Sequence, residues 1–166
     1  GILPVSTASH EHRRWMHLAL REAARAGEMG EVPVGSVVVL DGTIIGRGHN
    51  EVEMRGDASA HAEILAMRRA ADAVGSWRLN GADLYVTLEP CPMCAGALIL
   101  SRIRTLVFGA RDPKFGAVGS VTNLLDDGLP WNHRLEVVEG IDADASARLL
   151  KEFFQRRRSQ KRHEAP

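Results

Sequence analysis

The sequence predicts an α/β fold in three layers, α/β/α, with a five-stranded mixed sheet and helices on both faces. The chain has 166 residues, enough for one sizeable hydrophobic core. Segments with helical and strand periodicity follow one another in the order α-β-β-α-β-α-β-β-α. Strands joined by a short hairpin pair antiparallel and strands joined by a helix pair parallel, so the sheet must be mixed.

The amino-terminal part predicts a helix followed by a hairpin. Apolar and alanine residues recur at helical spacing over residues 10–27, where Gly27 ends the pattern. Two β-branched runs follow at residues 34–40 and 43–48. Asp41-Gly42 between them is a strong hairpin turn, so these two strands are expected to be antiparallel.

The middle of the chain predicts a helix, a strand and a second helix. Residues 50–59 are polar and irregular, and residues 60–74 have the Ala, Leu, Met and Glu content of a helix with His61 near its start. An alternating strand is expected over residues 82–88, and a helix over residues 92–101. Cysteines then lie at a helix amino terminus, where the backbone amides favour the thiolate form.

The carboxyl-terminal part predicts two further strands and a last helix. The strands are expected at residues 105–109 and 134–139, and an amphipathic helix from residue 143 to about residue 158. Residues 1–158 are therefore predicted to form a single domain, followed by a polar, frayed tail over residues 159–166.

The charge of the chain is balanced overall but not locally. Twenty-one basic residues match twenty-one acidic residues, so the average surface does not favour a polyanionic partner. The segment from Ala145 onward, however, carries a net charge of +5 against −5 for the rest. Phosphate contacts are expected there, although a basic helix end is more often simply solvated.

The hydropathy and cysteine patterns exclude several classes of protein. No apolar run approaches the roughly 20 residues that a membrane span requires, and the amino terminus lacks a signal-peptide core, so a cytoplasmic protein without a membrane partner is expected. The two cysteines are three positions apart, which excludes a disulfide scaffold. A Cys-x-x-Cys pair then indicates metal binding or a redox pair, and the redox interpretation leaves His61 and Glu63 unexplained.

His61, Cys91 and Cys94 offer three ligands to a zinc ion. A structural zinc site normally has four protein ligands, so three leave a position for water and indicate a catalytic metal. Glu63, two residues after the histidine, can then face that water and carry protons. His-x-Glu followed by Pro-Cys-x-x-Cys is the pattern of zinc-dependent deaminases. A structural zinc knuckle would need a fourth ligand, for which His133 is the only remote candidate.

Longer motifs around these residues make the chain similar to the bacterial tRNA-specific adenosine deaminases of the cytidine-deaminase superfamily. The similarity runs from Trp15 to Arg158. The motifs are Val32-Pro33-Val34-Gly35, Ala60-His61-Ala62-Glu63, Trp77-Arg78-Leu79, Leu84 to Cys91, Met93-Cys94-Ala95-Gly96, Ser101-Arg102-Ile103, Phe108 to Asp112 and Asn132-His133-Arg134.

The resemblance implies an activity, a cofactor and partners. The reaction would convert adenosine to inosine at the wobble position of a tRNA anticodon, usually that of an arginine tRNA. One Zn²⁺ per subunit would activate the water that attacks C6 of adenine, with Glu63 as proton shuttle. The partners would be the anticodon stem-loop and a second copy in a homodimer, and no nucleotide cofactor is expected.

The resemblance also implies contacts with the RNA. Asn50 would contact the target nucleoside, although Asn is also a common turn residue, and the Ala62 backbone amide would help to read the base. Further contacts are expected from residues that line the base pocket, flank the target nucleotide or lie on the last helix. These are Pro33, Val34, Leu88, Asp112, Asn132, Phe153, Phe154 and Arg156. Adjacent helix positions point about 100° apart, so only one of the two phenylalanines can face the core.

Two other functions remain compatible with the sequence. A deaminase of a free base or nucleoside, such as guanine or cytosine, would use the same zinc motif but would not need a basic carboxyl-terminal helix. A zinc-stabilised RNA-binding protein without turnover would leave Glu63 idle.

Overall fold

The computed structural model describes the backbone of residues 5–164 and the side chains of residues 9–164. Five helices and five strands are found in this part of the chain. They are α1 (Val5–Glu28), β1 (Gly35–Leu40), β2 (Thr43–His49), α2 (Val52–Arg55), α3 (Ala62–Val74), β3 (Asp83–Leu88), α4 (Pro92–Leu100), β4 (Thr105–Ala110), β5 (Glu136–Glu139) and α5 (Ala143–Glu164).

The strands form one mixed sheet in the order β2-β1-β3-β4-β5. Strand β1 is antiparallel to both of its neighbours, while β3, β4 and β5 are parallel to one another. The predicted hairpin and the predicted parallel pair are therefore confirmed. Because β1 alone is reversed, the carboxyl ends of β2, β3 and β4 meet at the same edge of the sheet.

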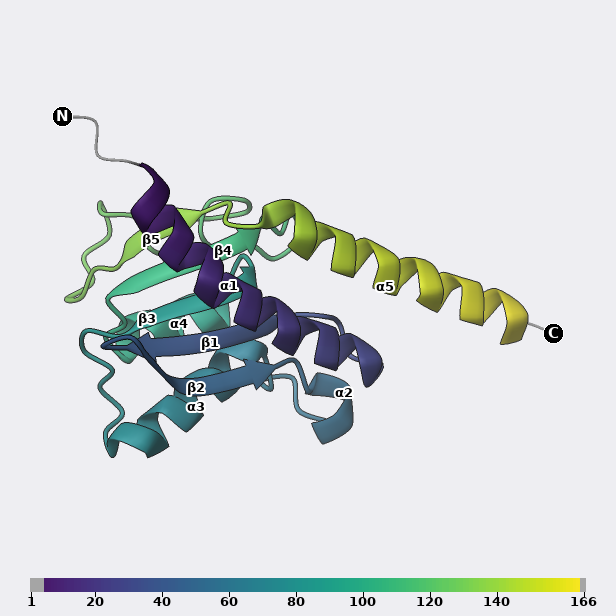
Figure 1. Cartoon of the computed structure of the whole chain (residues 1–166), viewed down its shortest axis with the longest axis horizontal. Coiled ribbons are helices and arrows are strands. Elements are labelled where there is room, and N and C mark those ends of the chain that lie inside the picture. Colours follow the sequence, from purple (N-terminus) through teal and green to yellow (C-terminus); the bar gives the residue numbers. More distant parts are fainter. Residues whose placement is uncertain (1–4, 165–166) are drawn as a thin grey trace.

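Helices cover both faces of this sheet, as predicted. Helices α1 and α5 lie on one face, and α3 and α4 lie on the other (Figure 1). Alternate strand residues supply the two cores: Val37, Tyr85 and Val107 pack on the α1 side, and Leu84 and Phe108 on the side of α3 and α4. The side chains that position α3 and α4 therefore come from the same strands whose ends carry the candidate site.

Two glycines allow the helices to approach the sheet closely. A Cβ atom at Gly35 would lie 2.0 Å from the Ala19 carbonyl oxygen of α1. A Cβ atom at Gly48 would lie 2.4 Å from the Ala62 carbonyl oxygen, at the start of α3. Any larger residue at Gly48 would push away the turn that carries Glu63.

In the first half of the chain, the main differences from the predicted helices concern α1 and α2. Helix α1 begins at Val5, and the short helix α2 lies within the segment predicted to be irregular. Its four residues are too few to show a helical period, and the Glu31 carboxylate supports them by accepting hydrogen bonds from the backbone of Glu53 and Met54.

The predicted end of the last helix near Arg158 is wrong, because α5 continues to Glu164. Arg, Gln and Lys beyond Arg158 are good helix formers, and neither Pro nor Gly interrupts them. The end of α5 projects beyond the body of the protein (Figure 1). The division into a domain over residues 1–158 and a tail over residues 159–166 stays a prediction, and residues 165–166 lie outside the described part. Among the described residues, no helix combines the length and the apolar character needed to span a membrane.

Candidate zinc centre

The three predicted zinc ligands come together at the carboxyl edge of the sheet. His61 is the amino-terminal cap residue of α3, and Cys91 is the cap residue of α4 directly after β3. Cys94 lies in the first turn of α4 and is fully buried. Two helix amino termini from separate parts of the chain therefore point at the same place, and their dipoles favour negatively charged ligands.

The spacing of the ligand atoms fits one tetrahedral zinc ion. Nδ1 of His61 lies 3.6 Å from Sγ of Cys91 and 3.6 Å from Sγ of Cys94. All three ligand atoms lie within 4.8 Å of one another. A nitrogen and a sulfur bound to one tetrahedral zinc at roughly 2.0 and 2.3 Å would be about 3.6 Å apart. The described residues offer no fourth ligand to this group, so His133 does not supply the fourth ligand that a structural knuckle would need.

The two thiols differ in acidity. A hydrogen bond from Cys94 lowers the pKa of Cys91 to about 4, with a further contribution from His61. The hydrogen bond to Cys91 and burial raise the pKa of Cys94. Cys91 is therefore the more acidic of the two thiols, and a thiolate at this position suits the pair to receive a cation. A bound cation favours deprotonation of both thiols.

Glu63, the predicted proton shuttle, is buried beside this centre. Its side chain is 4% exposed on the first turn of α3, and burial raises the pKa of its carboxyl above the ordinary value. The charge of nearby His61 partly opposes this effect. A carboxyl with a raised pKa can both accept and return a proton near neutral pH. This behaviour is what a proton shuttle requires.

Five other predicted site residues lie at the same edge of the sheet. Pro33 and Val34 precede β1, Asn50 follows β2, Leu88 ends β3, and Asp112 comes shortly after β4. The backbone N–H of Asn50 donates to the Val34 carbonyl at 3.1 Å, and Leu88 is in register with Ala110. The fold thus gathers these residues around the zinc ligands. Their contacts with a substrate stay predictions.

Asn50 already has a structural role. Its side-chain oxygen accepts from the backbone N–H of Val52 at 3.1 Å, and its amide nitrogen donates to the Val32 carbonyl at 3.3 Å. These bonds support the interpretation of Asn50 as a turn residue. One N–H of the amide remains for a second acceptor, so a contact with the nucleoside is compatible with this role.

The Ala62 backbone and Asp112 present further polar groups. The N–H of Ala62, at the first position of α3, has no acceptor within the helix. The Asp112 carboxylate accepts from the backbone of Lys114 at 3.0 Å and Phe115 at 3.3 Å, through the same oxygen. Its other oxygen is left for an external donor.

Asn132 lies at the far end of α4 from the zinc ligands. Its side-chain oxygen accepts from Arg102 at 3.3 Å, just beyond the carboxyl terminus of the helix. Nine helical residues, about 13 Å of helix, separate this end from Cys91. Within one chain, Asn132 therefore does not join the residues around the zinc ligands.

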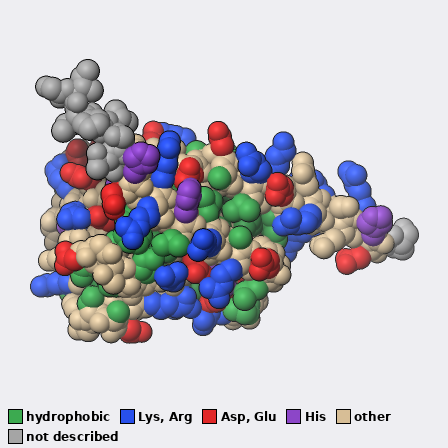
Figure 2. Space-filling view, viewed as in Figure 1, with side chains coloured by type: hydrophobic (Ala, Val, Ile, Leu, Met, Phe, Trp, Pro, Cys, Tyr) green, Lys and Arg blue, Asp and Glu red, His purple; other side chains and the backbone are tan. Residues whose placement is uncertain are grey.

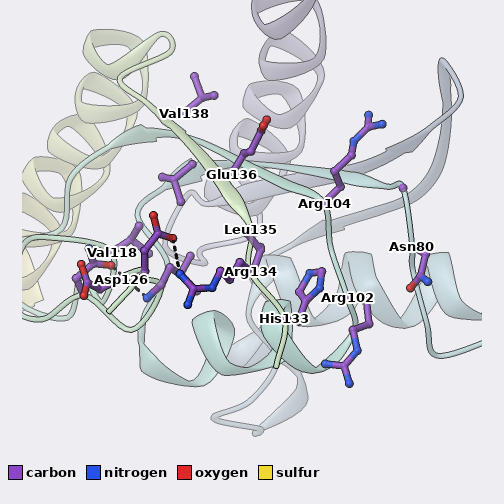
Figure 3. Close-up of a pocket in the computed structure, with 15 residues that line it drawn as sticks. Asn80, Arg102, Arg104, Val118, Asp126, His133, Arg134, Leu135, Glu136 and Val138 are labelled. Atoms are coloured by element: carbon purple, nitrogen blue, oxygen red, sulfur yellow. Dashed lines mark hydrogen bonds and ion pairs between the residues drawn. The ribbon is translucent and has the colours of Figure 1, made fainter. Parts of the chain in front are cut away.

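An open hollow of about 1000 Å³ lies beside Asn132, also away from the zinc ligands. His133, Arg134 and the arginines at positions 102 and 104 line it (Figure 3). Some of the charged groups of this hollow form ion pairs: Arg134 contacts Asp127 at 3.7 Å, and Arg104 binds Asp83 at 2.8 Å. The Nε2 atom of His133 is 2.7 Å from the Ile103 carbonyl oxygen, so this histidine has a structural partner.

The predicted residues of the last helix divide between core and surface. Phe153 is buried, whereas Phe154 is 40% exposed and packs edge-on against it at 5.3 Å between ring centroids. Arg156 is exposed. Lys and Arg side chains line the projecting part of α5 (Figure 2). The prediction that only one phenylalanine faces the core is confirmed.

Glu31 and Glu89 are two of the buried glutamates that the sequence did not single out. Glu31 binds the start of α2 through backbone N–H groups at 2.9 and 2.8 Å. Glu89 accepts from the backbone of Asp112, Val118 and Ser120, and from the Ser120 hydroxyl. Burial alone would raise the pKa of Glu89, but these four donors hold it below the ordinary value. Its position next to Pro90-Cys91 was the only signal in the sequence, because its bonding partners lie more than twenty residues away.

Comparison with known proteins identifies the family of this chain. Residues 10–158 match the family of MafB19-like deaminases. The tRNA-specific adenosine deaminase of Bacillus subtilis is 49% identical over 148 residues, which cover 89% of this chain and 91% of the relative. That of Agrobacterium fabrum is 48% identical over 148 residues, covering 89% and 97%. This chain belongs to the tRNA-specific adenosine deaminases.

Solved structures agree with this family. The deaminase superimposes with a TM-score of 0.77 on a structure from work on A-to-I editing by tRNA:A34 deaminases at the wobble position of transfer RNA. The two are 48% identical, and the match covers 82% of this chain and 99% of the other. A guanine deaminase from Nitrosomonas europaea gives a TM-score of 0.69 at 25% identity, covering 85% and 83%. The predicted fold and family are therefore confirmed.

Proposed function

We propose that this deaminase converts adenosine to inosine at the wobble position of a tRNA anticodon, that of an arginine tRNA. The observation that carries the chemistry is the buried Glu63 carboxyl beside three atoms spaced for one zinc ion. The relatives named tRNA-specific adenosine deaminases, at 48–49% identity, support the substrate. A cytoplasmic location of the enzyme is consistent with a tRNA substrate.

The reaction needs water, a proton carrier and a place for the base. His61, Cys91 and Cys94 would hold a zinc ion, which would supply a water nucleophile near neutral pH. Glu63 would accept the proton that the water releases and pass it to the ring nitrogen, and it would then move a second proton, from the added hydroxyl group, to the leaving amine. The carbon–nitrogen bond at C6 of adenine breaks, and the products are inosine and ammonia.

Residues at the edge of the sheet, near Glu63 and the candidate zinc ligands, would position the base. Pro33, Val34 and Leu88 provide apolar walls for the ring, and Asn50 and the Ala62 amide provide hydrogen bonds. The base must leave the stack of the anticodon loop to enter such a site.

Contacts with the rest of the RNA are proposed for α5, Asp112 and Asn132. The net charge of +5 from Ala145 onward supports binding of phosphates by α5, with Arg156 and the exposed Phe154 facing the loop. Asp112 suits a ribose hydroxyl or a base edge. Asn132 is separated from its own zinc ligands by α4, so a contact with a nucleotide next to the target is made more readily across a second subunit, which supports a homodimer.

Incubation of the zinc-loaded enzyme with an arginine-tRNA anticodon stem-loop, followed by nucleoside mass spectrometry, tests the proposal. Inosine should replace the wobble adenosine, and the Glu63→Ala variant should keep zinc and RNA binding but lose this product. Unchanged inosine formation in that variant would refute the role of Glu63 and indicate that another group carries the proton.

A free-base deaminase is the second candidate. A guanine deaminase from Bacillus subtilis matches 60% of this chain at 36% identity with a TM-score of 0.58. Parallel incubations with guanine, cytosine and adenosine separate the candidates. Consumption of a free base without inosine in the RNA would overturn the proposed substrate.

A further inference from the structure

The loop that follows β4, residues 111–120, is fixed to the zinc centre by the Glu89 carboxylate. One oxygen of Glu89 accepts from the Asp112 backbone at 3.0 Å. The other accepts from Val118 at 3.0 Å and from Ser120 at 3.1 Å. Glu89 is 2% exposed, and hydrogen bonds from buried donors to a carboxylate are among the stronger ones in proteins. Cys91 is only two residues away, so the loop and the zinc ligand are held by the same short segment.

The tight packing of this loop against Glu89 depends on Gly116. A Cβ atom there would lie 2.3 Å from a Glu89 carboxylate oxygen and 2.5 Å from the Asp112 carbonyl oxygen. A larger residue at position 116 would therefore push the loop away from Glu89 and from the segment that carries Cys91.

Phe115 projects from this fixed loop into solvent. Its backbone is held, because its N–H donates to the Asp112 carboxylate at 3.3 Å, while its side chain is 66% exposed. Two aromatic pairs occur among the described side chains, His12 with Tyr85 and Phe153 with Phe154, so Phe115 has no ring partner there. An exposed phenylalanine forgoes the gain in free energy that burial of its ring would bring. An exposed ring on a rigid loop is thus available to a partner.

The surroundings of Phe115 favour a nucleobase as that partner. The loop starts at the same sheet edge as the zinc ligands, and the exposed Lys114 beside the ring can meet a phosphate. Proteins that bind unpaired nucleotides stack the bases on aromatic side chains. When one base enters the zinc site, its neighbour loses a stacking partner and needs a new one.

We propose that Phe115 stacks on a base adjacent to the reacting adenosine and so helps to determine which RNA loops are accepted. This role rests on the proposed function. Glu89 contributes as a positioning residue, because it holds the loop that carries the ring.

The test compares Phe115→Ala with the unchanged enzyme on an anticodon stem-loop and on two matched RNAs. Each matched RNA has an abasic nucleotide on one side of the wobble adenosine. Base–aromatic stacking is worth 1–3 kcal/mol, so Phe115→Ala should lower kcat/KM on the intact RNA roughly 5- to 150-fold. On the RNA that lacks the stacked base, the two enzymes should become equal within about twofold. Phe115→Trp should restore the rate on the intact RNA.

Trp77→Ala serves as the matched control. Trp77 is also an exposed aromatic residue, at 58%, but it follows the carboxyl end of α3, whereas the zinc ligand His61 precedes the amino end. Its removal should leave the rates on all three RNAs unchanged.

The outcomes separate the inference from the function on which it rests. If the unchanged enzyme forms no inosine in the intact RNA, the proposed function fails and the role of Phe115 fails with it. If that enzyme is active but Phe115→Ala acts equally fast, only the inference is overturned. It is also overturned if the variant loses the same factor on all three RNAs or changes its oligomeric state, because Phe115 would then stabilise the loop or a protein interface.

Discussion

Substitution of Gly48 by alanine tests how the sheet positions the catalytic helix. Gly48 lies in β2, opposite the first turn of α3. A Cβ atom at this position would lie 2.4 Å from the Ala62 carbonyl oxygen and 2.8 Å from the Ala66 nitrogen. Both atoms belong to the backbone, so neither can rotate away as a side chain would. The start of α3, which carries Glu63, must move.

The size of the movement follows from ordinary contact distances. A carbon and an oxygen in contact lie about 3.4 Å apart, so the first turn of α3 must shift by about 1 Å. Overpacking of this kind lowers the free energy of unfolding by about 1–3 kcal/mol. A misplacement of about 1 Å in a catalytic group can reduce the rate about 10²-fold. We expect Gly48→Ala to show both effects, with the loss mainly in kcat.

The assay combines denaturant unfolding, zinc content and single-turnover deamination of the anticodon stem-loop. Gly96→Ala is the control, because a Cβ atom at Gly96 in α4 would meet nothing within 4 Å. Gly96 is only two residues from the ligand Cys94, yet its replacement should raise the free energy of unfolding by about 0.5–1 kcal/mol and leave the rate unchanged. A Gly48→Ala enzyme with the stability and rate of the unchanged protein would refute the argument that this close approach places Glu63.

Three further outcomes are expected. Chelation should abolish inosine formation and lower Tm, and added Zn²⁺ should restore both; activity in protein shown to be metal-free would exclude a catalytic metal. Glu89→Gln should lower the free energy of unfolding by about 2–4 kcal/mol, because the amide leaves at least one buried N–H without an acceptor and removes the charge. Glu139→Gln is the control, at an exposed ion pair with Arg111, and should change the free energy of unfolding by less than about 0.5 kcal/mol. An equal loss of stability in the two variants would contradict the role of Glu89. Truncation after Phe154 should weaken binding to the stem-loop and flatten its salt dependence, whereas an unchanged salt slope would show that the basic end of α5 is only solvated.

The zinc ligands and most of the fold were predictable because their signals are local. His61, Cys91 and Cys94 show the spacing of a metal site within short segments, and the hairpin turn at Asp41-Gly42 has its own chemistry. Alternation and helical periodicity then gave the order of the elements. The end of α5 was predicted wrongly, because a polar composition was interpreted as fraying although the residues favour a helix.

The contacts of the site were not predictable, because they join distant segments. Glu89 binds backbone groups more than twenty residues away, and nothing in its neighbourhood indicates that partner. The separation of Asn132 from the zinc ligands likewise depends on the direction of α4, which only the packed structure defines.

Short motifs in the sequence were enough to predict the kind of reaction, since ligand type, ligand number and the offset of Glu63 are properties of short motifs. The positions of the groups that would carry out this reaction are visible only in the folded structure. Burial of Glu63, the 3.6 Å ligand spacings and the fixed position of Phe115 arise from packing between elements far apart in the chain. Such packing depends on the shape and volume of many side chains together, and no short stretch of sequence contains that information.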